Sequence, residues 1–204
     1  MEAIKAIETK YNGYLFRSRL EARWAVFFDY AGIKYEYEPE GYELEDGTRY
    51  LPDFYLPELD MHVEVKGDPE TGNEEIANKS LKFVGYDSPI NRLLILTNVP
   101  LYNGVNCHPV MEYSSAVNTY AIMWGYFRPF SIRGKKKTIF MSLQPELFGQ
   151  PSSLVTTRKM SDLLLDNGYS ENTADEIEYR FCGRLYNSKI LDAYNVARQK
   201  RFEF

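Results

Sequence analysis

Residues Tyr50–Gly67 read YLPDFYLPELDMHVEVKG, and this stretch decides the fold. Its apolar, aromatic and β-branched residues predict two strands joined by a short connection, Pro-Glu-Leu-Asp. Alternate side chains of a strand lie on the same face, so Glu64 and Lys66 point to one side of the second strand. The opposite, apolar side is formed by Met61, Val63 and Val65. An acid and an amine are therefore held next to each other.

A second acid, Asp53, follows Pro52 in the first of these strands. If the two strands pair, Asp53 joins Glu64 and Lys66, which brings two carboxylates and one amine together. Hard divalent cations such as Mg²⁺ prefer oxygen ligands of this kind and keep waters for a substrate or nucleophile. The stretch therefore predicts a metal site.

Pro52-Asp53 followed by Glu64-Val65-Lys66 resembles the motif of the PD-(D/E)XK nuclease superfamily. A preceding segment, YLFRSRLEARWA at Tyr14–Ala25, is similar to the first helix of phage and prophage members, in which an acid completes the site. Glu21 is at the matching position. The resemblance covers roughly residues 1–100, and Ala197–Glu203 also resembles the end of those phage proteins.

The resemblance implies an α/β (α+β) fold with a restriction-endonuclease-like core, in which a mixed sheet is flanked by helices. This core is expected over residues 1–100. A β-rich extension that contains a β-hairpin is expected over 101–150, and a helical C-terminal region over 151–204.

The function implied by the resemblance is metal-dependent hydrolysis of phosphodiester bonds, chiefly in DNA, with Mg²⁺ or Mn²⁺. Asp53, Glu64 and the Val65 carbonyl would hold the cation, with Glu21 directly or through water. Lys66 would orient or help to deprotonate the attacking water. Two other interpretations stay open: a surface salt-bridge cluster, contributing under about 1 kcal/mol, and a catalytically silent nuclease-fold module that binds nucleic acid or a host protein.

Glu21 also has a purely structural interpretation. A helix is expected from Ser18 to Gly32, and Ser18 with Glu21 fits a capping box, in which the acid accepts a hydrogen bond from the backbone at the helix start. The buried face of this helix is predicted to contain Leu20, Trp24, Phe27, Phe28 and Ala31. Glu21 can serve both roles.

Periodicity and turn residues predict the other elements. The expected strands and hairpins are Ile4–Tyr14 with a turn at Asn12-Gly13, Lys34–Glu38, Tyr42–Leu44 with Arg49–Leu56, Arg92–Thr97, and two or three strands over Thr119–Ser142. The expected helices are Glu74–Tyr86, Thr157–Asn167, Glu171–Cys182 behind a Ser170 cap, and Ser188–Lys200. The last helices are expected either to pack on the core or to hold nucleic acid.

Val99–Pro109 is expected to be a loop. Its Cys107-His108 pair is interpreted as loop residues, because no second Cys-His pair stands at zinc-ligand spacing.

Two groups of lysines are candidates for nucleic-acid binding. Lys79 and Lys82 lie on one face of the helix expected at Glu74–Tyr86, and Lys135, Lys136 and Lys137 lie at a turn between aromatic strands. A solvated helix face and a solubilising hairpin tip are the alternatives. His62 shares the face of Glu64 and is interpreted as a spectator rather than a ligand.

Charge is divided unevenly along the chain. The net charge of −5 argues mildly against a nucleic-acid partner, but residues 1–100 hold 19 acids and 11 bases while residues 101–204 hold 10 acids and 13 bases. A basic second half would supply phosphate contacts. DNA is the expected partner, and a homodimer or a phage or host protein partner is left open.

The two cysteines make neither a zinc site nor a disulfide framework, and neither a signal-peptide pattern nor a long apolar run is present. The expected location is the cytoplasm of a prokaryotic or phage-infected cell.

Overall fold

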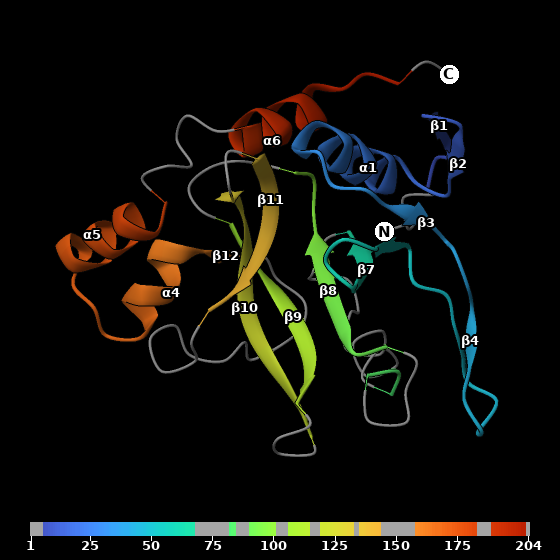
Figure 1. Cartoon of the computed structure of the whole chain (residues 1–204), viewed down its shortest axis with the longest axis horizontal. Coiled ribbons are helices and arrows are strands. Elements are labelled where there is room, and N and C mark those ends of the chain that lie inside the picture. The colour runs from blue at the N-terminus through green and yellow to red at the C-terminus, as the bar shows by residue number, and fades with distance from the viewer. Residues whose placement is uncertain are drawn as a thin grey trace, which may run out of the picture.

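The computed structural model describes residues 6–67, 82–84, 90–100, 106–114, 119–132, 135–143, 158–182 and 189–202. Within these residues the architecture is mixed α/β: an eight-stranded sheet is accompanied by two small hairpins and four helices (Figure 1). No helix of the described part is both long and apolar enough to cross a membrane.

The main sheet runs in the order β11-β10-β9-β8-β7-β6-β3, and β12 pairs with β9. Its strands are β3 (Glu36–Tyr37), β6 (Phe54–Leu56), β7 (Met61–Lys66), β8 (Arg92–Thr97), β9 (Asn106–Ser114), β10 (Thr119–Ile132), β11 (Lys135–Ser142) and β12 (Arg158–Lys159). β7 and β8 are parallel, whereas the other paired neighbours are antiparallel. The separate hairpins are β1 (Thr9–Tyr11) with β2 (Tyr14–Phe16) and β4 (Tyr42–Glu43) with β5 (Arg49–Tyr50).

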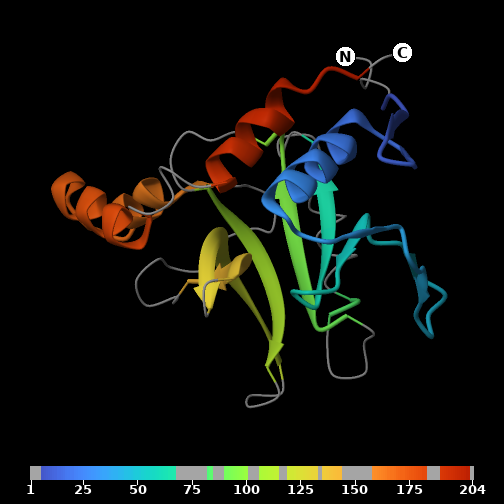
Figure 2. The same ribbon diagram turned by 45° about the horizontal axis from the view of Figure 1, so that its top comes forward.

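Helix α1 (Arg19–Ala31) lies across one face of the sheet, with α6 (Lys189–Gln199) beside it (Figure 2). Ser18 caps its start, and Gly32 ends it with a left-handed φ of 72°, a conformation that glycine adopts without strain. The Arg23 guanidinium donates to the Ala197 carbonyl over 2.7 Å, which ties α1 to α6. The helices α4 (Met160–Asp166) and α5 (Glu171–Cys182) pack against each other at the far side of the sheet from β4 (Figure 1).

The alternation of β7 and β8 divides the core between the two faces of the sheet. Val63, Val65, Leu94 and Leu96 belong to the larger cluster, which contains the aromatic face of α1 and also residues of α4, α5 and α6. Leu93 and Ile95 belong to a smaller cluster with Tyr50, Phe83, Val84, Ile90 and Met111. The C-terminal helices therefore pack on the core, one of the two arrangements that the sequence left open.

Most of the predicted elements are present, several in shorter form. The turn at Asn12-Gly13, helix α1, the strands β7 and β8, and helix α5 have the predicted type and approximate place. Phe27, Phe28 and Ala31 are buried with Trp24, whereas Leu20 is only partly buried.

Four local predictions were wrong. The expected loop at Val99–Pro109 ends early, because β9 begins at Asn106 and buries Cys107 and His108. Arg49–Leu56 is interrupted between β5 and β6, since Pro52 lacks a backbone N–H for a sheet ladder. The expected helix Glu74–Tyr86 does not include residues 82–84, which form a turn and a bridge to Ile90; its remainder lies outside the described residues. The expected turn at residues 133–137 is shorter, because Lys135, Lys136 and Lys137 pair with β10.

Candidate functional site

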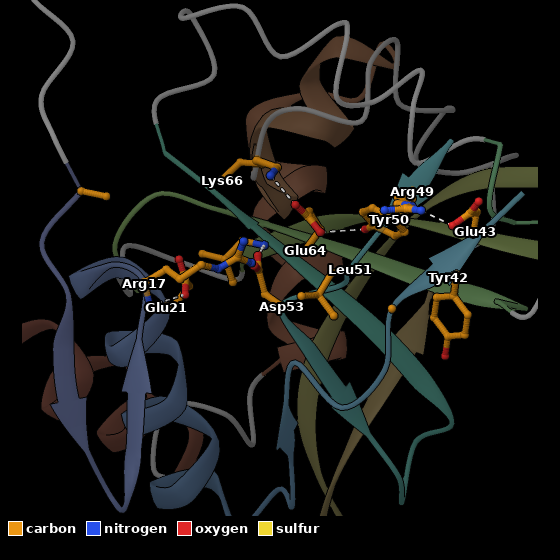
Figure 3. A pocket seen from close by; sticks show the side chains of 13 residues that line it. Arg17, Glu21, Tyr42, Glu43, Arg49, Tyr50, Leu51, Asp53, Glu64 and Lys66 are labelled. Atoms are coloured by element: carbon orange, nitrogen blue, oxygen red, sulfur yellow. Dashed lines mark hydrogen bonds and ion pairs between the residues drawn. The ribbon is translucent and has the colours of Figure 1, made fainter. Parts of the chain in front are cut away.

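A cavity of about 750 Å³ brings together the residues that the sequence singled out for catalysis (Figure 3). Its lining includes Glu21 from α1, Asp53 from the connection between β5 and β6, and Glu64, Val65 and Lys66 from β7. The antiparallel pairing of β6 with β7 is what carries Asp53 to the second strand. The expected juxtaposition of two carboxylates and one amine is therefore present in the fold.

Glu64 is only 5% exposed, and both of its carboxylate oxygens have a partner. Lys66 forms an ion pair with Oε1, and the Tyr50 hydroxyl donates to Oε2 over 2.7 Å. Glu64 and Lys66 are two residues apart on a strand, so their side chains share a face, as the alternation of β7 requires. Tyr50 stacks at 5.0 Å on Phe83 in the smaller core cluster, which fixes its hydroxyl toward the cavity.

Asp53 is 3% exposed and is joined to β7 by a backbone hydrogen bond. The Val65 N–H donates to Oδ2 over 2.7 Å, and the Arg17 guanidinium donates to Oδ1 over 2.8 Å. Burial raises the pKa of Asp53 well above its usual value, and the charges of Glu64 and Glu21 raise it further, against the opposing effects of the Val65 N–H and Lys66. The carboxylates of Asp53, Glu64 and Glu21 are therefore close enough to repel one another in the protein interior, and a bound cation would reduce this repulsion.

Glu21 carries out the capping role that its spacing from Ser18 predicts, in a modified form. Its backbone N–H donates to Ser18 Oγ over 3.1 Å, and the Ser18 hydroxyl donates back to Oε1 over 2.6 Å. Oε2 accepts from the Arg17 N–H over 3.1 Å, one residue before the cap, and from the Tyr37 hydroxyl over 2.6 Å. The Glu21 carboxylate therefore orders the start of α1 while its charge acts on Asp53.

Arg17 lines the cavity and was not among the residues that the sequence singled out. Its Nη2 contacts Asp53, its Nε lies 2.5 Å from Glu38 Oε1, and about half of the side chain is exposed. The guanidinium thus bridges Asp53 and Glu38 while its residue lines the cavity. Tyr37 and Tyr50, which bond the acids, were missed as well; no spacing rule identifies them, because strand pairing brings them to the site.

Of the lysines proposed for nucleic-acid binding, Lys82 and Lys137 have described side chains, and neither lines this cavity. Lys82 pairs with Asp46 over 3.0 Å at the tip of the β4–β5 hairpin, and Lys137 pairs with Glu58 over 3.3 Å. Only the strand positions of Lys135 and Lys136 are described, and Lys79 lies outside the described residues. Lys82 and Lys137 therefore gain no support as parts of the site.

The two histidines have structural surroundings. His62 contacts the Tyr42 hydroxyl at 3.0 Å and packs on the Tyr55 ring at 4.8 Å, outside the cavity, as expected of a spectator. His108 is buried, its Nε2 lies 3.1 Å from the Tyr194 hydroxyl, and burial lowers its pKa to about 3. His108 is therefore a neutral core residue that links β9 to α6.

The donor set fits a cation held by two carboxylates rather than three. Among the described residues, no group of three or more His, Cys, Asp and Glu side chains is arranged to hold a metal. Asp53 and Glu64 are buried carboxylates whose charges interact, which is the chemistry that a hard divalent cation favours. In the part of the chain that the structure describes, the Glu21 oxygens accept three hydrogen bonds, from Ser18, Arg17 and Tyr37. Asp53 and Glu64 have two partners each there, so an indirect role suits Glu21 better.

Comparisons of the chain with protein-family models, with curated proteins and with solved structures find no match.

Proposed function

We propose that the protein is a Mg²⁺- or Mn²⁺-dependent nuclease with a restriction-endonuclease-like core, acting on phosphodiester bonds in DNA. One observation carries the proposal: the cavity buries Asp53 and Glu64 on adjoining strands beside Lys66. A stable fold gains little from gathering two buried acids, because each charge must be removed from water. A catalytic site, in which the two carboxylates bind a cation, accounts for their burial beside Lys66.

In this proposal Asp53, Glu64 and the Val65 carbonyl hold the cation, and Glu21 acts through water. The bound cation would supply charge stabilisation at the phosphoryl oxygen and favour deprotonation of a water molecule. Lys66 holds its ammonium beside Glu64, where it would orient the attacking water and offset charge on the phosphate. Arg17 would exchange its contact with Asp53 for the incoming phosphate, since its guanidinium is half exposed and suits bidentate phosphate contacts.

The arrangement of the elements is in keeping with the proposed core. α1 precedes the strands, β6 and β7 are antiparallel, and β7 and β8 are parallel in the middle of a mixed sheet. The resemblance implies a core in the order helix, three strands, helix, strand. The second helix of that order, expected at Glu74–Tyr86, lies mostly outside the described residues and does not include residues 82–84. Phage-type members of the superfamily are the ones that the start of α1 resembles.

A second candidate is a catalytically silent module of the same fold that binds nucleic acid or a host protein. The observation that favours it is the saturation of the acids. Tyr50 and Lys66 bond Glu64, and Arg17 and the Val65 N–H bond Asp53, so the cluster is neutralised in part by protein groups.

The test that separates the two candidates is a cleavage assay. The purified protein would be incubated with single-stranded, duplex and branched DNA and with RNA, in Mg²⁺ or Mn²⁺, and then with a chelator. We expect cleavage of at least one DNA substrate, abolished by the chelator. The silent module would cut none of these substrates, and would bind them only if its partner is nucleic acid.

A further inference from the structure

A second cavity, of about 670 Å³, lies between the β1–β2 hairpin and the chain that follows α6. In both ribbon views the segment after α6 runs back toward this hairpin (Figures 1 and 2). Its lining includes Lys10, Tyr11, Arg19, Lys200, Arg201 and Phe202. We call this cavity the basic groove.

The charge of the basic groove is opposite to that of the catalytic cavity. Among the described residues, Lys10, Arg19, Lys200 and Arg201 line it together with one acid, Glu8. The catalytic cavity is instead lined by four acids and three bases: Glu21, Glu43, Asp53, Glu64, Arg17, Arg49 and Lys66. On a chain of net charge −5, a concave surface with an excess of cations is complementary to a polyanion.

The aromatic rings of the basic groove hold cations in place. Lys200 Nζ lies 5.7 Å from the centre of the Tyr11 ring, and the Arg23 guanidinium lies 5.9 Å from the centre of the Phe202 ring. The two rings meet edge to face at 6.2 Å. Because cations cover a face of each ring, the groove is better suited to phosphates than to stacked bases.

Two cations of the basic groove stay available for a ligand. Within the described part of the chain, Lys10 and Arg201 form no ion pair, and both are exposed. The groove is also held in shape without a ligand, since Arg23 ties α1 to the Ala197 carbonyl just before it. A preformed site loses less entropy on binding.

The basic groove and the catalytic cavity are lined by residues that are close together in the sequence. Ala6 and Arg17 line the catalytic cavity, while Ile7 and Arg19 line the basic groove. We propose that the basic groove binds the sugar-phosphate backbone of a nucleic-acid strand next to the phosphate that enters the catalytic cavity. This inference rests on the proposed function for the identity of its ligand, and it predicts binding without dependence on base sequence.

The test uses the full chain with Lys10→Gln and Arg201→Gln combined. A matched control, Lys34→Gln with Lys189→Gln, removes the same charge at exposed sites outside both cavities. Binding of a fluorescein-labelled single-stranded DNA would be measured by anisotropy in chelator over a range of salt. We expect the groove variant to bind about tenfold more weakly at low salt. Its slope of log affinity against log salt should be smaller by about 1.4, because each lost phosphate contact removes about 0.7.

The control should bind as the wild type does. Equal binding by the groove variant and the control, or no binding by the wild type, would overturn the inference. Failure of the proposed function gives a different result: if the wild type cuts no substrate but the groove variant loses binding, the basic groove stands and catalysis does not. If the wild type cuts DNA and the groove variant binds DNA as the wild type does, the proposed function stands and the inference about the basic groove fails.

Discussion

At the scale of single residues, Asp53 has opposing influences in the cavity that it lines with Glu64. Burial and the charges of Glu64 and Glu21 favour its protonated form, whereas Arg17 and the Val65 N–H bond its carboxylate oxygens. Because the first group of effects prevails, the folded protein holds a proton on Asp53 at pH values where the unfolded chain has lost it. Without metal, the ionised Asp53 therefore lowers the free energy of unfolding.

Asp53→Asn should raise the melting temperature in chelator at pH 7. Asn keeps an acceptor for the Val65 N–H and removes the buried charge; about 1 kcal/mol corresponds to about 2–4 °C in a chain of this size. The pKa of Asp53 is higher in the folded protein than in the unfolded chain, where it is 3.8. The ionised carboxylate therefore does not destabilise the fold below pH 3.8, and its destabilising effect grows as the pH rises toward the folded pKa. The gain of Asp53→Asn should accordingly shrink as pH falls from 7 to 4.

Calorimetry at several pH values checks this prediction. Asp60→Asn is the control, because Asp60 is exposed and its positive φ of 47° also suits Asn. A melting temperature of Asp53→Asn below that of the wild type at every pH would show that the bond to Arg17 outweighs the burial of charge.

At the scale of elements, the start of α1 shows how one side chain serves both a helix and a site. Glu21 accepts hydrogen bonds from Ser18, Arg17 and Tyr37, while its charge reaches Asp53. The helix boundary and the electrostatics of the cavity therefore depend on the same carboxylate. Two substitutions separate these roles.

Glu21→Gln should melt near the wild type, because Gln also serves in a capping box. It should cleave DNA about 10–100-fold more slowly, the usual effect of losing an outer partner of a metal site. Glu21→Ala should lower the free energy of unfolding by about 1–2 kcal/mol, because the Ser18 hydroxyl, the Arg17 N–H and the Tyr37 hydroxyl lose their acceptor. Thermal melts and initial cleavage rates are the measurements; a fully active Glu21→Gln would leave only the capping role.

The elements that the sequence predicted well are those that depend on local patterns, such as helix caps and the alternation of side chains in a strand. Ser18 and Gly32 bound α1, and the alternation of Tyr50–Gly67 indicated β7 and the placement of Glu64 beside Lys66. The contacts it did not reveal connect distant residues. Arg17 meets Asp53 across 36 positions, and Tyr50 meets Glu64 across 14. Such partners depend on how hairpins pair with the sheet, which local periodicity does not encode.

The start of β9 illustrates the same limit. Asn, Pro and Gly around residues 99–109 favour a loop, yet His108 is buried by Tyr194, which lies 86 positions further along the chain. Packing between the sheet and α6 overrides the local preference. The error concerned burial that only the tertiary fold supplies.

At the scale of the whole molecule, His108 ties the sheet to the C-terminal helix. Its folded pKa of about 3 lies below its usual value of 6.5, so the unfolded chain binds a proton first as pH falls. His108 therefore leaves the free energy of unfolding unchanged above about pH 6.5, and it lowers that free energy progressively as the pH falls from 6.5 toward 3. His108 thus makes the docking of α6 sensitive to acid.

His108→Gln should melt at a temperature that changes less between pH 7 and pH 5 than that of the wild type, because Gln bonds Tyr194 without titrating. His62→Gln is a control for loss of an imidazole. His62 is half-buried, and Asp60 opposes the lowering of its pKa, so this substitution should remove a smaller part of the pH dependence. Thermal melts of the three proteins at matched pH decide the point; identical pH dependence in all three would contradict it.

Glu64→Gln tests most directly our proposal that Asp53 and Glu64 hold a catalytic cation. Glu43→Gln is the matched control, since Glu43 lines the same cavity but pairs with Arg49 on the exposed β4–β5 hairpin. Cleavage rates of labelled DNA in Mg²⁺ would be measured for the wild type and both variants. We predict a loss of at least about 100-fold for Glu64→Gln, more than an outer partner usually contributes, and a rate near the wild type for Glu43→Gln. Wild-type cleavage by Glu64→Gln, or equal losses in both variants, would contradict the assignment.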